Sequence, residues 1–132
     1  MTDFTVDDIL MPLAITVIID KKIRDPEMNA YCEWAETLMP LFNLPIPPRK
    51  DIIDWFNNHE PIISEKLKGP RKNTSVLVAL TKFKEDIHVE NIYEAMVAIS
   101  ICDQEYKREE SELIKSAGLI WGYNRPPIKV DD

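Results

Sequence analysis

The chain of 132 residues lacks several features on which common enzyme classes depend. It has only three glycines, and neither a G-x-G-x-x-G nor a G-x-x-x-x-G-K motif occurs, so a glycine-rich phosphate-binding loop is excluded. The same scarcity argues against a β-sandwich or β-barrel with many turns. No pairing of a nucleophile with a base is visible in the sequence. We therefore do not expect an enzyme, and no cofactor is required.

Cysteines and long apolar runs are also scarce. The two cysteines, Cys32 and Cys102, form no C-x-x-C pair and lie in apolar periodic segments, which is typical of reduced core thiols in a cytosolic protein. The longest apolar run, residues 9–19, is too short to cross a membrane and contains Pro12. The N-terminus lacks the basic region of a signal peptide. We expect a cytoplasmic protein without membrane insertion.

The net charge of −7 is unevenly distributed along the chain. Residues 1–48 carry −5, residues 49–84 carry +4 and residues 85–132 carry −6. A nucleic-acid-binding protein would need a dominant positive stripe, so we expect no nucleic-acid partner. The layout suits cation binding near the ends or contact between oppositely charged surfaces. We expect a protein partner of unknown identity, and self-association into a homo-oligomer stays open.

Helical periodicity dominates what is present. Apolar residues recur at intervals of three or four residues along most of the chain, which predicts an all-α fold, a compact bundle of six or seven helices. Thr5 or Asp7 begins the first predicted helix, although its β-branched run could also favour a strand. Asp25 is the expected N-cap of the second, with Pro26 as its first residue. Three prolines make residues 43–49 a linker.

Prolines and capping residues also divide the second half of the chain. A third helix is expected around Phe56, and Pro61 is expected to break it or to open a new helix. Thr74 or Ser75 can cap a further helix that runs to Ile87. Two more helices are predicted, one ending near residue 103 and one near residue 121.

Two stretches of the chain align at a constant offset of 83 residues, from Leu13 to Leu38 and from Met96 to Trp121. Each has an apolar helix that ends in Asp, a large apolar residue three positions later and a Glu seven positions later, followed by an amphipathic helix. We predict one domain over residues 1–122, with repeat units at about 8–42 and 89–122 joined by residues 43–88. Residues 123–132 form an extended C-terminal tail.

The position of the Asp in each repeat needs a physical explanation. A carboxylate at a helix C-terminus faces the negative end of the helix dipole, which is unfavourable. One compensation is local, because the Asp side chain can accept backbone N–H groups from the following turn. The other is a bound cation shared with nearby acids. The Glu at the start of the next helix is favoured by that helix's dipole.

These pieces resemble the tellurite-resistance B (TerB)-like domain, and they are similar to the N-terminal domain of a membrane-anchored J-domain co-chaperone. The resemblance covers roughly residues 8–122 and depends on two segments, Ile19-Asp20-Lys21-Lys22-Ile23 with Glu27, and Cys102-Asp103-Gln104-Glu105-Tyr106 with Glu109 and Glu110. It implies a non-catalytic, stress-associated domain of duplicated helical units that acts as a partner in larger assemblies, with metal binding proposed through these acids. The family's Gly after the Asp is Lys21 in one repeat here and Gln104 in the other.

The second acidic turn is the strongest candidate for a metal site. Its four carboxylates could supply oxygen ligands to Ca²⁺ or Mg²⁺, although their spacing is not that of an EF-hand: Asp103, Glu105, Glu109 and Glu110. The first repeat is a weaker candidate, because Lys21, Lys22 and Arg24 oppose a cation at Asp20 and Glu27. The alternative is that all these acids only cap helices.

A second candidate site is an interaction patch. Trp55 lies in the sequence near the basic residues Arg49 and Lys50, and a partly exposed Trp beside positive charge is typical of a partner-binding surface. Core burial of Trp55 is the alternative. Two functions therefore stay open: a TerB-like domain that binds a divalent cation, and a protein-interaction or assembly module whose acids serve only as helix caps.

Overall fold

The computed structural model of the protein describes residues 4–19, 25–84, 86–102 and 108–122. This part of the chain forms six α-helices and contains no strand, which confirms the predicted all-α fold. The helices are α1 (Val6–Ile18), α2 (Asp25–Leu41), α3 (Arg49–Lys68), α4 (Lys72–Thr81), α5 (Val89–Ile101) and α6 (Arg108–Trp121). The predicted tail, residues 123–132, lies outside the described residues.

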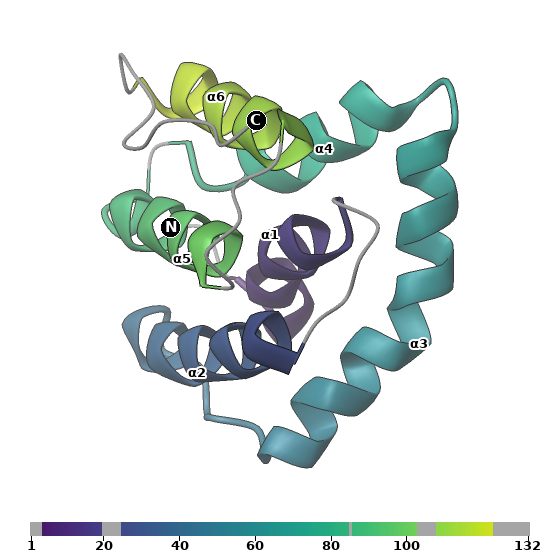
Figure 1. The fold of residues 1–132 in the computed structure, drawn as a ribbon. Coiled ribbons are helices and arrows are strands. Elements are labelled where there is room, and N and C mark those ends of the chain that lie inside the picture. The colour runs from purple at the N-terminus through teal and green to yellow at the C-terminus, as the bar shows by residue number, and fades with distance from the viewer. Residues whose placement is uncertain (1–3, 20–24, 85, 103–107, 123–132) are drawn as a thin grey trace.

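Helix α1 lies at the centre of the bundle and contacts α2, α3, α4 and α5 (Figure 1). Nine of its 13 residues are buried. The β-branched run from Ile15 to Ile18 has a strand propensity when taken alone, but packing on several sides outweighs that preference. The helix that contacts α2 to α5 is therefore held mainly by tertiary contacts.

A capping box fixes the start of α1. The Thr5 hydroxyl accepts a hydrogen bond from the backbone N–H of Asp8 at 3.2 Å, and the Asp8 carboxylate accepts one from the N–H of Thr5 at 3.0 Å. Two N–H groups that a helix start would leave without partners are thereby satisfied. Of the two starts that the sequence offered, Thr5 is the one used. Helix α2 begins at Asp25, one residue before the expected Pro26.

The helix boundaries repeat with the offset seen in the sequence. Val6 and Asp25, which begin α1 and α2, lie 83 residues before Val89 and Arg108, which begin α5 and α6. The two helix pairs pack together through the contact of α1 with α5. The predicted repeat units at about 8–42 and 89–122 stay a prediction. The Asp-containing turns of both repeats lie outside the described residues.

The expectation that Pro61 ends a helix is wrong, because α3 runs without interruption from Arg49 to Lys68. Proline removes one hydrogen bond to the residue four positions earlier, here Asn57, and its ring crowds that carbonyl. Both residues are exposed, so water can solvate the freed carbonyl. Figure 1 shows that α3 changes direction along its length, which is the usual response to an internal proline.

The expectation that one helix extends to Ile87 is also wrong. Helix α4 ends at Thr81, and Ile87 is 87% exposed. Two successive turns follow, in which Phe83 and Lys84 donate backbone N–H groups to carbonyls three residues earlier. The Asp86 carboxylate then accepts the N–H of His88 at 2.8 Å, just before α5 begins. Phe83 continues the apolar spacing of the helix and is buried, but it lies in the turn that follows the helix.

The linker and the cysteines agree with the sequence. Two residues after the end of α2, Asn43 has a φ of 60°, and the backbone N–H of Leu44 donates to the Met39 carbonyl at 2.9 Å. The chain thereby turns into the proline-rich segment that precedes α3. Cys32 is buried and Cys102 is half-buried, and neither forms a disulfide within the described residues. No helix in the described part of the chain is both long and apolar enough to cross a membrane.

Candidate functional site

The predicted metal ligands fall mostly outside the described residues. Asp20, Asp103 and Glu105 are not described, and only the backbone of Glu109 and Glu110 is, as the second and third residues of α6. Glu27 lies in the first turn of α2, as expected, and is only 1% exposed. Among the side chains that the structure describes, no group of three or more His, Cys, Asp or Glu could hold a metal ion. Metal binding at the second acidic turn stays a prediction.

The basic residues of the predicted interaction patch differ in their environment. Arg49 binds Glu36 of α2 with both ends of its guanidinium, at 2.7 Å from Nη2 and 3.2 Å from Nε. This hydrogen bonding lowers the pKa of Glu36 and raises the pKa of Arg49 from their ordinary values. Lys50 is exposed. Arg49 therefore joins α3 to α2, whereas Lys50 makes no ion pair within the part of the chain that the structure describes.

Trp55 is half-buried and joins α3 to α1. Its indole Nε1–H donates to Asp7 Oδ1 at 2.8 Å, and its ring stacks on His59 with centroids 4.0 Å apart. His59 Nδ1 lies 2.8 Å from the carbonyl oxygen of Trp55. Asp7 and His59 both line a groove on this side of the molecule. Trp55 thus lies beside that groove and holds two of its lining residues in place.

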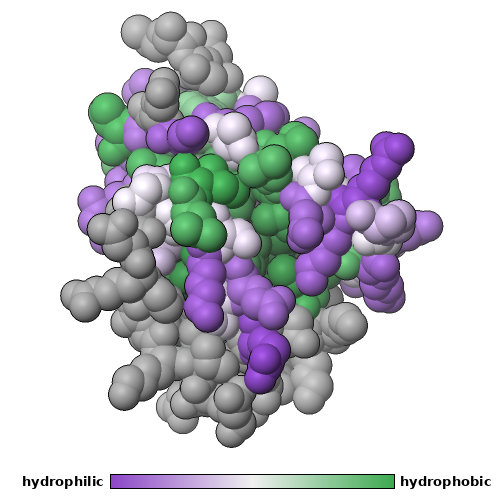
Figure 2. Space-filling view, turned by 90° about the horizontal axis from the view of Figure 1, so that it is seen from above, coloured by the Kyte–Doolittle hydropathy of each residue, from purple (hydrophilic) through white to green (hydrophobic). Residues whose placement is uncertain are grey.

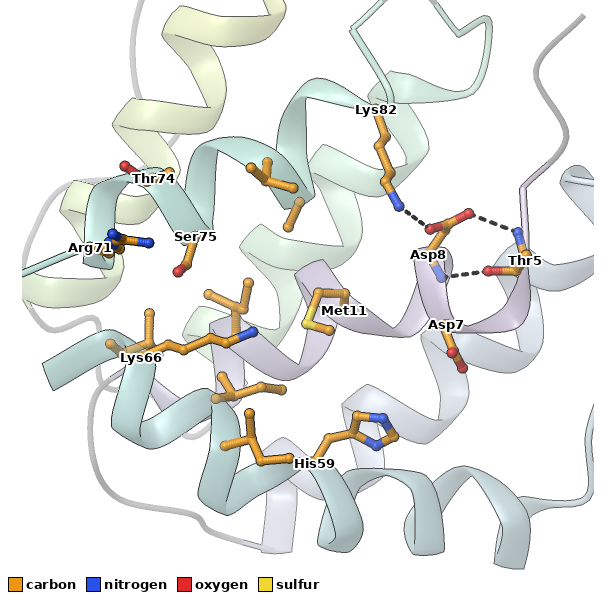
Figure 3. A pocket seen from close by; sticks show the side chains of 16 residues that line it. Thr5, Asp7, Asp8, Met11, His59, Lys66, Arg71, Thr74, Ser75 and Lys82 are labelled. Atoms are coloured by element: carbon orange, nitrogen blue, oxygen red, sulfur yellow. Dashed lines mark hydrogen bonds and ion pairs between the residues drawn. The ribbon is translucent and has the colours of Figure 1, made fainter. Parts of the chain in front are cut away.

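The groove lies between α1, α3 and α4 and has a volume of about 640 Å³ (Figure 3). This is within the range of roughly 300–1,000 Å³ that is usual for binding pockets. Its apolar lining comes from all three helices and includes Met11, Ile15, Ile62, Ile63, Leu67 and Val78. Ile62 on α3 is 55% exposed and Val78 on α4 is 59% exposed. Two helices therefore present uncovered apolar side chains to one groove.

One end of the groove is closed by internal polar contacts. Figure 3 shows Thr5, Asp8 and Lys82 together at this end. Lys82 Nζ binds Asp8 Oδ1 at 2.5 Å, which ties α4 to the capping box of α1. Partial burial raises the pKa of Asp8, but the hydrogen bonds from Lys82 and Thr5 outweigh it, so the pKa lies below the ordinary value of 3.8.

The opposite end of the groove is positively charged. Figure 3 shows Lys66 of α3 near Arg71, Thr74 and Ser75 at the start of α4. Among the described residues, neither Lys66 nor Arg71 makes an ion pair. The first turn of α4 contains no acidic residue. The acids that line the groove, Asp7 and Asp8, belong to the other end. Lys66 and Arg71 therefore give this end two positive charges that no acidic side chain of the described residues pairs with.

A second apolar surface lies over α4 and α6. Figure 2 shows hydrophobic side chains exposed on this face, with hydrophilic ones on either side. A hollow of about 370 Å³ between the two helices is lined by the exposed Leu77 and Leu119. Lys72 and Glu112 both line it, so it has no net charge of one sign. This face is apolar like the groove, but it has no end with positive charge alone.

No family model, no curated protein and no solved structure matches the chain. The TerB-like resemblance is therefore supported only by the two sequence segments that carry it. The groove is the feature of the structure that points to a function.

Sequence reasoning did not identify the groove. Ile62 and Ile63 are adjacent apolar residues of α3, but only Ile63 is buried. Val78 was not singled out. A signal was nevertheless present, because Leu77 and Val78 on α4 lie between the buried positions Val76 and Ala79, which leaves more apolar residues than one helix face can bury.

Proposed function

We propose that this protein is an interaction module that binds a segment of a partner protein in the groove between α1, α3 and α4. The observation that carries the proposal is the exposure of Ile62 and Val78 on two helices that line one groove. Exposed apolar side chains gathered at one concave site are a common mark of a binding surface. Each would lose contact with water when a partner fills the groove.

A helix is the partner element that best fits this shape. The α1 residues that line the groove extend from Thr5 to Ile15, which corresponds to roughly 15 Å along the helix axis. An apolar groove of that length suits an amphipathic helix of about three turns, with anchors three and four residues apart. A protein segment of this kind would lie along α1 with Ile62 and Val78 on either side.

This function agrees with what the TerB-like resemblance implies, a non-catalytic domain that acts within larger assemblies. It is the alternative in which the acids of the repeats serve as helix caps. Cation binding at Asp103, Glu105, Glu109 and Glu110 is a separate prediction, and the groove requires no metal.

The test is selection from a displayed library of helical peptides of about 14 residues. The library varies the apolar face among Leu, Ile, Val, Met and Phe, and varies the flanking positions among Glu, Lys and Gln. The full chain should select peptides whose binding is lost in Val78→Asp, because a carboxylate in the apolar lining would be desolvated by the bound helix. The measurement is the dissociation constant of each selected peptide, by fluorescence anisotropy.

The matched control is Ile87→Asp, which places the same charge at an exposed apolar residue that does not line the groove. It should bind the selected peptides as the wild type does. Failure to select any peptide, or equal binding to wild type and Val78→Asp, would show that the groove is not a docking site.

A further inference from the structure

We infer that the partner segment is an acidic amphipathic helix whose carboxylates lie at one end, against Lys66 and Arg71. The inference rests on the proposed function and adds the chemistry and the orientation of the occupant. It follows from the unequal ends of the groove: Asp8 and Lys82 neutralise each other at one end, while Lys66 and Arg71 make no ion pair at the other within the described residues.

The distribution of charge in the whole chain makes this end distinctive. Residues 49–84, which include α3 and α4, carry +4, whereas the chain as a whole carries −7. An acidic partner is therefore repelled by most of the molecule and attracted to this region. Complementary charge mainly steers encounter and selects between partners, while burial of apolar surface provides most of the affinity.

The polar groups of this end also fit carboxylates in particular. Thr74 and Ser75 add hydroxyl donors beside the guanidinium of Arg71, which can bind a carboxylate through two parallel hydrogen bonds. Lys66 follows Ile62 by four residues on α3, so its charged group and the exposed apolar anchor face the same side of the helix. One bound helix could then contact Ile62 through a leucine and Lys66 through a glutamate about one turn away.

The same display library tests the charge of the partner. The wild type should enrich Glu at the flanking positions of one end of the peptide and leave the other end unselected. The double variant Lys66→Glu with Arg71→Glu should instead enrich Lys at those positions. For a selected peptide, replacement of its Glu residues by Gln should weaken binding to the wild type about 3- to 10-fold at low salt. That difference should shrink as salt screens the charges.

The matched control is Lys50→Glu with Lys84→Glu, which reverses two exposed basic residues that do not line the groove. It should still enrich Glu. Loss of Glu enrichment in this control would overturn the inference and would place the acidic contact elsewhere, with Lys50 and Trp55 as the first candidates.

The remaining outcomes separate the inference from the proposed function. If Val78→Asp abolishes binding but Glu, Gln and Lys are selected equally, the groove is a docking site and the acidic partner is wrong. If no peptide depends on Val78, the proposed function fails first. Vesicles with and without anionic phosphatidylserine serve as a third probe: binding to the anionic vesicles that Val78→Asp abolishes, without peptide binding, would assign the groove to lipid and overturn the inference.

Discussion

At the scale of single residues, Asp8 takes part in three separate features of the structure. Its carboxylate completes the capping box with Thr5, binds Lys82 of the segment that follows α4, and lines the groove. The side chain of Lys82 is half exposed, so solvent screens the ion pair and limits its contribution to about 1 kcal/mol or less. Asp8 therefore holds the start of α1 beside the end of α4, although the ion pair itself adds little to the free energy of unfolding.

Asp8 makes stability depend on pH in the acidic range. Its folded-state pKa lies below 3.8, so its contribution is present above the unfolded-state value and is lost as pH falls through the folded-state value. At pH 7 Asp8→Asn should lower the free energy of unfolding by up to about 1 kcal/mol, and the difference from wild type should shrink as the pH falls below 3.8. Urea denaturation between pH 2 and pH 7 measures this.

The control for Asp8→Asn is Asp54→Asn, which removes an exposed carboxylate of α3 that makes no hydrogen bond or ion pair with the described residues and does not line the groove. It should leave the acid dependence close to that of wild type. A difference between Asp8→Asn and wild type that persists unchanged at pH 2 would contradict the assignment of the ion pair to this carboxylate.

At the scale of elements, α3 shows most clearly where sequence reasoning succeeds and fails. Its apolar period around Ile52 and Phe56 was read correctly, and both residues are buried. The effect of Pro61 was not, because the cost of an internal proline depends on whether the freed carbonyl can reach water. That depends on how α3 lies against α1, which no local pattern contains. The same applies to α4, where Phe83 is buried by tertiary contacts beyond the helix end.

The proline in α3 predicts a gain in stability when it is replaced. Pro61→Ala restores a backbone N–H that can donate to the carbonyl of Asn57, and the side chain is exposed, so no packing is lost. We expect the free energy of unfolding to rise by roughly 1–2 kcal/mol, after the greater freedom of the unfolded chain is taken into account. Chemical denaturation gives the value directly.

The comparison variant for Pro61→Ala is Pro70→Ala, in the turn between α3 and α4. It gains no helical hydrogen bond and should be neutral or destabilising. If Pro61→Ala is no more stable than wild type, the bend of α3 is held by its contacts with α1 and α4 and not by the proline.

At the scale of the whole molecule, the groove exists only because α1 meets α3 and α4, two consecutive helices that come much later in the chain. The duplicated unit could be read from an offset between two stretches, since each copy is local in sequence. The groove could not, because its apolar residues come from α1, α3 and α4 and each looks like an ordinary core residue in its own helix. The charged end was visible only as a basic stretch, and its opposition to the Asp8–Lys82 end needed coordinates.

The interaction function also makes a prediction about metals for the whole chain. If the repeat acids only cap helices, millimolar Ca²⁺ or Mg²⁺ should not raise the Tm, since a ligand that binds only the folded state would stabilise it. Asp103→Asn with Glu110→Gln should then leave binding of the selected peptides unchanged. Thermal denaturation and calorimetry of both proteins test this. A metal-dependent rise in Tm that the double variant abolishes would establish the cation site instead.

The aromatic contact at the start of the chain has a consequence for biosynthesis. Phe4 stacks on Phe83 with ring centroids 4.9 Å apart. At a translation rate of roughly 5–20 residues per second, the 79 residues from Thr5 to Phe83 take about 4–16 s to synthesise, and those of α5 follow later. Among the helices that the structure describes, α1 is therefore synthesised before every helix that it contacts. Until α5 emerges, the face of α1 that α5 covers in the folded protein has no helix to pack against on the nascent chain.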